Sequence, residues 1–190
     1  MKKTRLLVCL SMAVGLLALF GQSSSWALTT DDYYVGYYNL GPSAPFISSG
    51  DNTLRIVNPG TSGGNLCANI YLFDSSQNMQ ACCSCYVSPD GMLNLSVQNL
   101  LGSSSRVRSG VIKVVSGSVT RGCSDTSVTP ADELRGWIAH FPGIGFPPAS
   151  AISEQELLGA DLSADELANL QSECGSPNVR SCSRSCPSVD

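Results

Sequence analysis

Apolar and polar residues alternate along the middle of the chain with the period of two that is typical of half-buried β-strands. Leu54 and Ile56 alternate with Arg55, and Leu93 and Leu95 flank a polar residue. Similar runs, separated by Gly, Pro, Asn and Asp turn residues, predict five strands at about 54–57, 66–73, 79–87, 93–98 and 110–116. Strands at this spacing favour a mainly β chain, folded as an antiparallel Ig-like or Greek-key β-sandwich stapled by disulfides.

Residues 130–141 carry two conflicting signals. A Thr-Pro pair followed by two acids is typical of the start of a helix. Trp137 and Phe141 are aromatic and Ile138 is β-branched, which favours a strand. We predict a helical turn followed by a last sandwich strand over 134–141, with a longer helix as the alternative.

Residues 152–190 are predicted to form a short helical appendage and a cysteine-bearing tail. A Pro/Gly-rich linker at 142–151 precedes them in the sequence. A capping box that begins at Ser163 predicts a helix start. Leu167, Leu170 and Cys174 then fall on one helical face. The tail that follows has no apolar periodicity, so we expect it to need crosslinks in order to fold.

The first 27 residues have the composition of a secretory signal peptide. Three basic residues precede an apolar run over 6–20, and small residues at positions 25 and 27 form a cleavage site. This run is shorter than the roughly 20 residues that a helix needs to span a bilayer. We therefore expect a secreted or periplasmic protein without a stable membrane anchor.

A segment rich in tyrosine, residues 28–50, separates the signal peptide from the predicted sandwich, which occupies 51–141. Its Gly and Pro residues predict an extended lead-in. Tyrosine offers a flat apolar face with a polar tip, so these rings either form a stacking platform for a sugar or a protein, or pack over the edge of the domain. The four residues are Tyr33, Tyr34, Tyr37 and Tyr38.

The charge balance argues against nucleic acid as a partner. The chain has a net charge of −4, and removal of the signal peptide leaves eight basic residues against fifteen acids. Nucleic-acid binding needs a basic stripe or patch, whereas the densest basic cluster in this chain is the pair Arg106 and Arg108. We expect a protein or glycan partner at the cell surface, and the oligomeric state stays open.

Eight of the nine cysteines follow the predicted signal peptide. Because thiols pair outside the cytosol, an even number in an exported chain indicates a disulfide framework. Each crosslink stabilises the fold mainly by restricting the unfolded chain. The eight are Cys67, Cys82, Cys83, Cys85, Cys123, Cys174, Cys182 and Cys186.

The predicted hairpin over 66–87 favours a first pairing of Cys67 with Cys85. A turn that pairs Asp74 with Asn78 sets these two cysteines directly opposite each other on one face of the hairpin. Directly opposed cysteines in a non-hydrogen-bonded pair lie close enough to form a bridge.

The other cysteines are less constrained, because eight cysteines allow 105 connectivities. Cys82 points to the opposite face and is assigned to Cys123. A register slip would bring Cys83 into the first pairing instead, and a vicinal bridge from Cys82 to Cys83 is a further alternative. The three C-terminal cysteines then compete, one pairing locally and one fastening the tail to the sandwich.

No catalytic, cofactor-binding or metal-ligating residue is assigned from the sequence. The Cys-Cys-Ser-Cys run at 82–85 lacks the C-x2-C spacing of common zinc and redox motifs, and a thiolate-rich metal cluster is kept as an alternative. His140 is the chain's single histidine, so any Ser-His-Asp or Cys-His mechanism requires it. The acids between residues 154 and 173 follow one helical stretch, which is more typical of a solvated face than of a catalytic pair.

Six segments carry a recognisable combination of motifs: LRIVNPG at 54–60, LCANIY at 66–71, QACCSC at 80–85, GVIK at 110–113, LRGWI at 134–138 and the segment 162–174. In these segments the chain resembles a group of uncharacterised, exported, cysteine-rich bacterial proteins. The likeness covers most of the chain after the signal peptide. It implies membership of that group and export, and it carries no known activity and no catalytic residues.

Together these patterns predict a secreted, non-catalytic module with a structural, adhesive or ligand-binding role. Two alternatives belong to other classes of protein. One is a secreted hydrolase whose carboxylates come together only in the fold, and the other is a thiol-based metal-binding protein.

Overall fold

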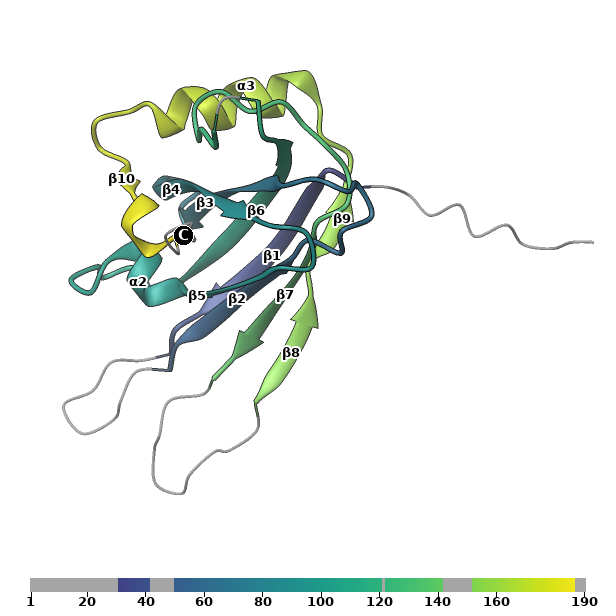
Figure 1. Ribbon diagram of the computed structural model, residues 1–190. Coiled ribbons are helices and arrows are strands. Elements are labelled where there is room, and N and C mark those ends of the chain that lie inside the picture. Colours follow the sequence, from purple (N-terminus) through teal and green to yellow (C-terminus); the bar gives the residue numbers. More distant parts are fainter. Residues whose placement is uncertain (1–30, 42–49, 121, 142–151, 187–190) are drawn as a thin grey trace, which may run out of the picture.

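Two β-sheets and a helix that lies outside one of them make up the structure (Figure 1). This computed structural model describes residues 31–41, 50–120, 122–141 and 152–186. The predicted signal peptide and the predicted linker at 142–151 lie outside the described residues. The prediction of a mainly β chain with several disulfides is confirmed.

The larger sheet has six strands in the order β10-β4-β3-β6-β1-β9. Neighbouring strands are antiparallel, except that β10 runs parallel to β4, so the sheet is mixed. Its strands are β1 (Tyr33–Asn39), β3 (Leu66–Asp74), β4 (Met79–Val87), β6 (Ser109–Ser118), β9 (Leu158–Ala160) and β10 (Arg180–Ser181).

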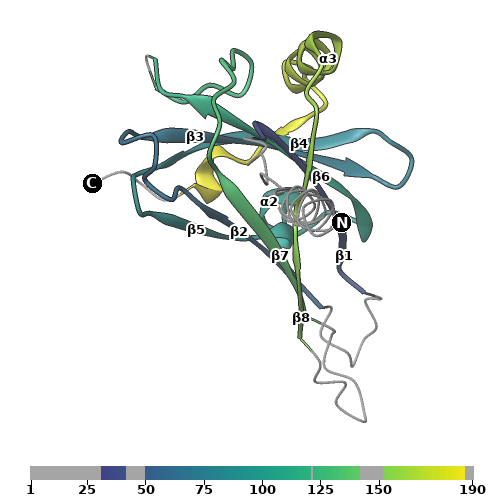
Figure 2. The same cartoon turned by 90° about the vertical axis from the view of Figure 1, so that its right-hand side faces the viewer.

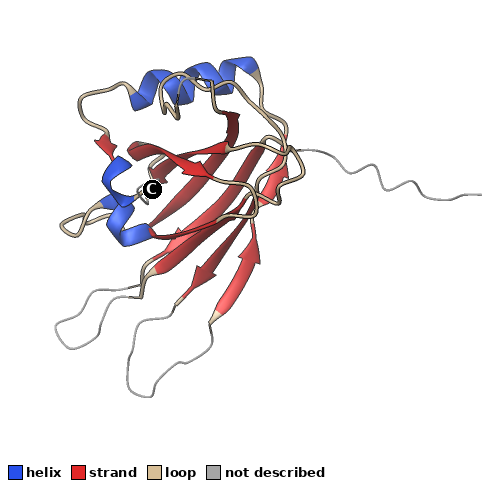
Figure 3. Cartoon of the chain, viewed as in Figure 1, coloured by secondary structure: helices blue, strands red, loops and turns tan. Residues whose placement is uncertain are grey.

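The smaller sheet has four antiparallel strands in the order β5-β2-β7-β8. Figure 3 shows its strands in front of the larger sheet, with the helices at the periphery. Its strands are β2 (Asn52–Val57), β5 (Met92–Ser96), β7 (Arg135–His140) and β8 (Ser153–Glu156).

The main core lies between the two sheets and explains the alternation in the sequence. Leu54 and Ile56 of β2 are almost fully buried, and they belong to the same hydrophobic cluster as Ile70 and Leu72 of β3. Strand β3 is buried on both faces, because a second cluster on its other side joins it to the helix α3 (Ala164–Cys174). Figure 2 shows this layering, with α3 outside the larger sheet.

The predicted helix in the C-terminal part is confirmed. The Ser163 hydroxyl accepts a hydrogen bond from the backbone N–H of Glu166 at 3.1 Å, as the capping box predicts. Leu170 and Cys174 are the residues that α3 buries. Two further short elements are the helix α2 (Val97–Leu101) and the 3₁₀ turn η1 (Ser183–Ser185).

Pairs of strands are nested along the chain and alternate between the sheets. The hairpin β3–β4 lies in the larger sheet, and the strands on either side of it in sequence, β2 and β5, pair in the smaller sheet. The next strands outward, β1 and β6, pair again in the larger sheet. Because the paired strands come from distant segments, this nested arrangement brings residues that are far apart in the sequence to the same end of the molecule.

The sheets extend beyond the predicted limits of 51–141. The predicted lead-in contributes β1, which lies between β6 and β9 inside the larger sheet. The predicted C-terminal appendage contributes β8 and β9. The polar and acidic residues of β8 hid its strand character, because the whole strand is exposed, and β9 has only three residues. These are short edge strands, in which solvated and charged side chains are common.

The predicted strand at 134–141 is confirmed as β7, whereas the helical turn before it is wrong. Residues 130–134 contain no helical turn; instead Pro130 forms an isolated bridge with Gly117, and the Ala131 N–H donates to the Ser116 carbonyl at 3.0 Å. The predicted strand at 93–98 is confirmed as β5 only as far as Ser96. Residues 97–98 belong to α2 instead, because the Ser96 side chain caps that helix.

Candidate functional site

The four tyrosines of β1 separate into three buried rings and one exposed ring. Tyr33, Tyr34 and Tyr38 are at most 6% exposed, while Tyr37 is 51% exposed. A platform of all four tyrosines is therefore wrong, and the alternative that the rings pack within the domain holds for three of them. The reason is that β1 is an interior strand, so that most of its side chains meet a core on one face or the other.

The hydroxyl groups of the buried rings serve the structure. Tyr38 donates to the Phe73 carbonyl at 3.0 Å, Tyr34 contacts the Leu134 carbonyl, and Tyr33 donates to the Glu166 carboxylate at 3.2 Å. Burial raises the pKa of Tyr33, with a further contribution from the Glu166 charge, and burial followed by the charge of Asp74 raises that of Tyr38. These phenols stay protonated and tie elements together.

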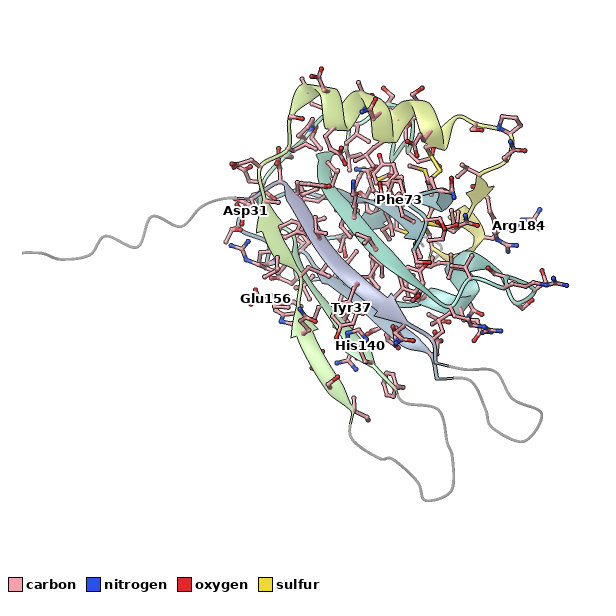
Figure 4. All side chains as sticks on the ribbon, turned by 180° about the vertical axis from the view of Figure 1, so that it is seen from behind. Asp31, Tyr37, Phe73, His140, Glu156 and Arg184 are labelled. Carbon is pink, nitrogen blue, oxygen red and sulfur yellow. A yellow bond between two sulfur atoms is a disulfide. The ribbon has the colours of Figure 1, made fainter. Side chains whose placement is uncertain are left out.

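Tyr37 stacks on His140, the single histidine of the chain. The ring centroids are 4.7 Å apart and the ring planes differ by 22°. The two residues come from different sheets, Tyr37 from β1 and His140 from the last position of β7, and Figure 4 shows them side by side at one end of the strands. Strand β9 pairs only with residues 33–35 of β1, which leaves Tyr37 uncovered on that side.

The surroundings of His140 favour the neutral form of its imidazole. Burial lowers its pKa from the ordinary value of 6.5, because the charged form loses solvation. Its Nε2 atom is enclosed and has no hydrogen-bond partner in the described part of the chain. The described residues therefore place neither a nucleophile nor a carboxylate in hydrogen-bond contact with that nitrogen, as a catalytic triad requires.

Polar groups surround the stacked pair. Asn39 lies two positions after Tyr37 on the same side of β1 and is exposed, and Ser153 pairs with His140 across β7 and β8 and is also exposed. The buried Asn52 pairs with His140 on the other side, and its Oδ1 accepts a hydrogen bond from the Asn39 N–H at 2.7 Å. The pair thus presents one aromatic face beside exposed amide and hydroxyl groups.

The eight cysteines form four disulfides, and the predicted bridge from Cys67 to Cys85 is wrong. The bridges join Cys67 to Cys123, Cys82 to Cys174, Cys83 to Cys182, and Cys85 to Cys186. The predicted bridge from Cys82 to Cys123 and the vicinal alternative do not form either. Three bridges join strand β4 to the C-terminal segment.

A change of register in the β3–β4 hairpin explains the failure. Phe73 lies opposite Met79, as predicted, but the register shifts at Leu72, which lies opposite Ala81. A shift of one residue moves every later side chain to the other face of a strand. Cys85 consequently lies opposite Ala68 rather than Cys67, and it faces the core between the sheets.

The cysteines of β4 face both sides of the larger sheet. Cys82 lies with the cluster under α3 and bonds to Cys174 at the end of that helix. Cys83 lies in the core between the sheets, on the side where the tail returns as β10. Three cysteines within four residues of a strand must face both sides of its sheet. The sequence alone therefore indicates that they need partners on both faces.

Two groups of residues have the proximity of a metal site but not its chemistry. In each group the possible ligand atoms, one from each residue, lie within 4.8 Å of one another, and every cysteine involved is in a disulfide. Metal ligation by cysteine uses the thiolate, which a disulfide sulfur does not offer. The groups are Cys83, Cys85 and Cys186, and Cys82, Asp125 and Cys174.

The prediction that the acids between residues 154 and 173 follow one helical stretch is wrong. Glu154 lies on β8 and pairs with Arg55 at 2.6 Å, and Glu166 lies on α3 and pairs with Lys113 at 2.5 Å. The two carboxylates thus bind different cations on different elements, rather than facing each other across a shared cleft.

The four disulfides indicate an oxidising, extracytoplasmic environment. None of the helices in the described part of the chain has the length and apolar character needed to cross a bilayer. The signal peptide itself stays a prediction, because its residues are not described.

Comparisons with known proteins add little to this description. No protein-family profile and no curated protein matches the chain. Among solved structures, the crystal structure of Thermotoga maritima 1070 is similar over 72% of this chain and 100% of its own, with 12% sequence identity and a TM-score of 0.48. A likeness at this level carries no argument about the present chain.

Proposed function

We propose that the chain is an extracytoplasmic, non-catalytic binding module that recognises a glycan through the exposed ring of Tyr37. The observation that carries this proposal is the stacking of a half-exposed tyrosine on the one histidine of the chain. Of the four tyrosines singled out by the sequence, Tyr37 alone belongs to this proposed site, because the other three are buried.

The chemistry of a sugar ring suits this pair. A pyranose has one face of C–H groups, which packs on an aromatic ring, and a rim of hydroxyl groups, which bond to polar side chains. Asn39 and Ser153 are exposed beside the pair and supply an amide and a hydroxyl for that rim. Burial lowers the pKa of His140, which favours an uncharged ring beside Tyr37.

The arrangement of the strands is compatible with such a role. We propose that the nested strand pairs are the jelly-roll form of a Greek-key sandwich, in which successive hairpin pairs alternate between two sheets. Jelly rolls include lectin domains and many unrelated proteins, so the function depends on the site and not on the fold.

Binding to a glycan array, followed by titration of the best glycan, tests the proposal. Replacing Tyr37 with Ala is expected to weaken binding about tenfold, because an aromatic contact contributes ~0.5–1.5 kcal/mol beyond its buried area. Met92→Ala is the matched control, since Met92 is 56% exposed on the outer strand β5 of the smaller sheet. It is expected to leave the affinity unchanged.

Two results would contradict the proposal. One is the absence of saturable binding to any glycan on the array, and the other is an affinity that Tyr37→Ala does not change. Recovery of a protein partner whose binding depends on Tyr37 would replace the glycan with a protein as the ligand of the same surface.

A further inference from the structure

A hollow lined by two arginines lies beside the end of the larger sheet, separate from the Tyr37–His140 pair. Its volume is about 350 Å³. It is bounded on one side by the first residues of the turn after β3 and on the other by the residues that lead into β6. The lining residues are Asp74, Ser75, Arg106, Val107, Arg108 and Ser109.

The two guanidinium groups have no acidic partner. Neither Arg106 nor Arg108 forms an ion pair or a side-chain hydrogen bond with any described residue. The Nη1 atom of Arg108 is enclosed and also lacks an acceptor. A buried guanidinium nitrogen without an acceptor is costly, and this one points to an acceptor that the described residues do not supply.

The carboxylate in the hollow does not fill this role. Asp74 Oδ1 accepts hydrogen bonds from the backbone N–H groups of Ser76 and Asn78 at 2.8 and 2.9 Å, and Oδ2 accepts one from Gln80 at 2.8 Å. Asp74 therefore closes the turn between β3 and β4. It lies more than ion-pair distance from both arginines, and its charge reduces but does not cancel their combined charge.

The backbone on which the arginines stand is fixed. The Leu40 N–H donates to the Arg108 carbonyl at 2.7 Å, and Ser109 pairs with Asn39 at the start of β6. At Gly110, the next residue, a Cβ would collide with the Phe73 carbonyl, so the chain passes as close to β3 as glycine permits. The backbone at Arg108 is thus held against its neighbours, so the side chain starts from a fixed position at the hollow.

We propose that this hollow binds the oxyanion group of a ligand, a sulfate, phosphate or carboxylate. A guanidinium presents its donors in a planar fork that matches two oxygens of such a group, and charge-assisted bonds of this kind are stronger than neutral ones. The hydroxyl groups of Ser75 and Ser109 line the same hollow and are further donors. This site does not depend on the proposed glycan site, because the two share no residue.

Titration of the mature, disulfide-intact protein with sodium sulfate, sodium phosphate and sodium acetate tests the proposal. Chloride keeps the ionic strength constant, and the amide NMR signals of residues 74–75 and 106–109 report binding. We expect saturable shifts confined to these residues, and a loss of affinity of at least tenfold in Arg108→Gln. The order of the three anions identifies which oxyanion the site prefers.

Three variants separate specific binding from other effects. Arg106→Gln changes an exposed residue and is expected to weaken binding without affecting the fold. Arg55→Gln is the matched control, because Arg55 stands on the other sheet and is paired with Glu154. Tyr37→Ala is expected to leave anion binding unchanged, so failure of the glycan site would not affect this result.

The proposal is overturned if no anion gives saturable shifts at these residues. It is also overturned if Arg55→Gln weakens binding as much as Arg108→Gln and Arg106→Gln, since the effect would then be general electrostatics. Equal affinity in the wild type and both pocket variants would contradict it as well.

Discussion

The two edges of the larger sheet, one beside β4 and the other beside β1, are stabilised in different ways. At the β4 edge three disulfides join one strand to the C-terminal segment, whose strand β10 has only two residues. At the β1 edge none of the described residues is crosslinked. There the sheets meet through buried side chains such as Leu157, and Tyr37 and His140 stack at the surface.

The difference follows from what each segment can bury. The tail contributes few apolar side chains, so covalent bonds replace the burial that it lacks. The β1 edge buries three tyrosines and Leu157 and needs no such bonds. The surfaces that we propose for ligands lie on β1, β7 and the start of β6, away from the three bridges to the tail.

Removing disulfides should have the largest effect on stability and is the strongest test of this comparison. Replacing both Cys67 and Cys123 with Ala opens a loop of 56 residues that no second bridge closes, and should lower the free energy of unfolding by about 4 kcal/mol. Replacing Cys85 and Cys186 opens a bridge that spans 101 residues, but the neighbouring bridges still hold the tail. The expected loss is about 2 kcal/mol.

Urea denaturation without reductant measures both losses. The order is the informative result, because the bridge with the longer sequence separation is expected to matter less. An equal or larger loss for the Cys85–Cys186 pair would show that the three bridges to the tail are not redundant.

The stability of the β1 edge, where none of the described residues is crosslinked, should depend on the side chain of Leu157. This side chain is 4% exposed, and its methyl groups occupy the space that a Cβ would take at both Gly36 and Gly136. Replacing Leu157 with Ala leaves a cavity between β1 and β7 and should lower the free energy of unfolding by about 3 kcal/mol. The adjacent Leu158 is 67% exposed, so Leu158→Ala is a control that should change it by less than about 0.5 kcal/mol. Similar losses for the two variants would mean that Leu157 does not hold this edge.

The smallest expected effect concerns His140 and pH. Its pKa is lowered in the folded protein by burial, so the unfolded chain takes up the proton first as the pH falls below 6.5. Stability is then lost as the pH falls from 6.5 toward the lower folded value, and the loss is small because the ring is only partly buried. In His140→Asn this part of the pH dependence should disappear, as measured by unfolding at pH 7.5 and 5.5. An unchanged slope would contradict the burial of the imidazole.

Much of the two sheets could be predicted, because several of their strands bury one face and therefore alternate in sequence. The hairpin β3–β4 and the capped helix α3 follow from local signals, a polar turn and a Ser cap. Strand β1 was missed because its tyrosines are both apolar and polar, and β8 because an exposed edge strand shows no apolar period.

The pairing of the cysteines and the two candidate sites could not be predicted, for physical reasons that differ. A single register shift at Leu72 reverses the faces of β4, and no residue type in the hairpin announces it. The Tyr37–His140 pair and the arginine hollow join segments that are distant in sequence, so only the fold brings them together. The basic pair Arg106 and Arg108 was visible in the sequence, but its lack of an acidic partner was not.

Mapping the disulfides tests the central claim, that strand β4 holds the C-terminal segment at three points. Trypsin cleaves after Arg180 and Arg184 and so separates the three tail cysteines, and cleavage before Asp74 separates Cys67 from the cysteines of β4. Without reduction, mass spectrometry should find all three tail fragments bound to the β4 fragment, and Cys67 bound to the fragment of Cys123. Tail fragments bound to one another, or Cys67 bound to β4, would contradict the account.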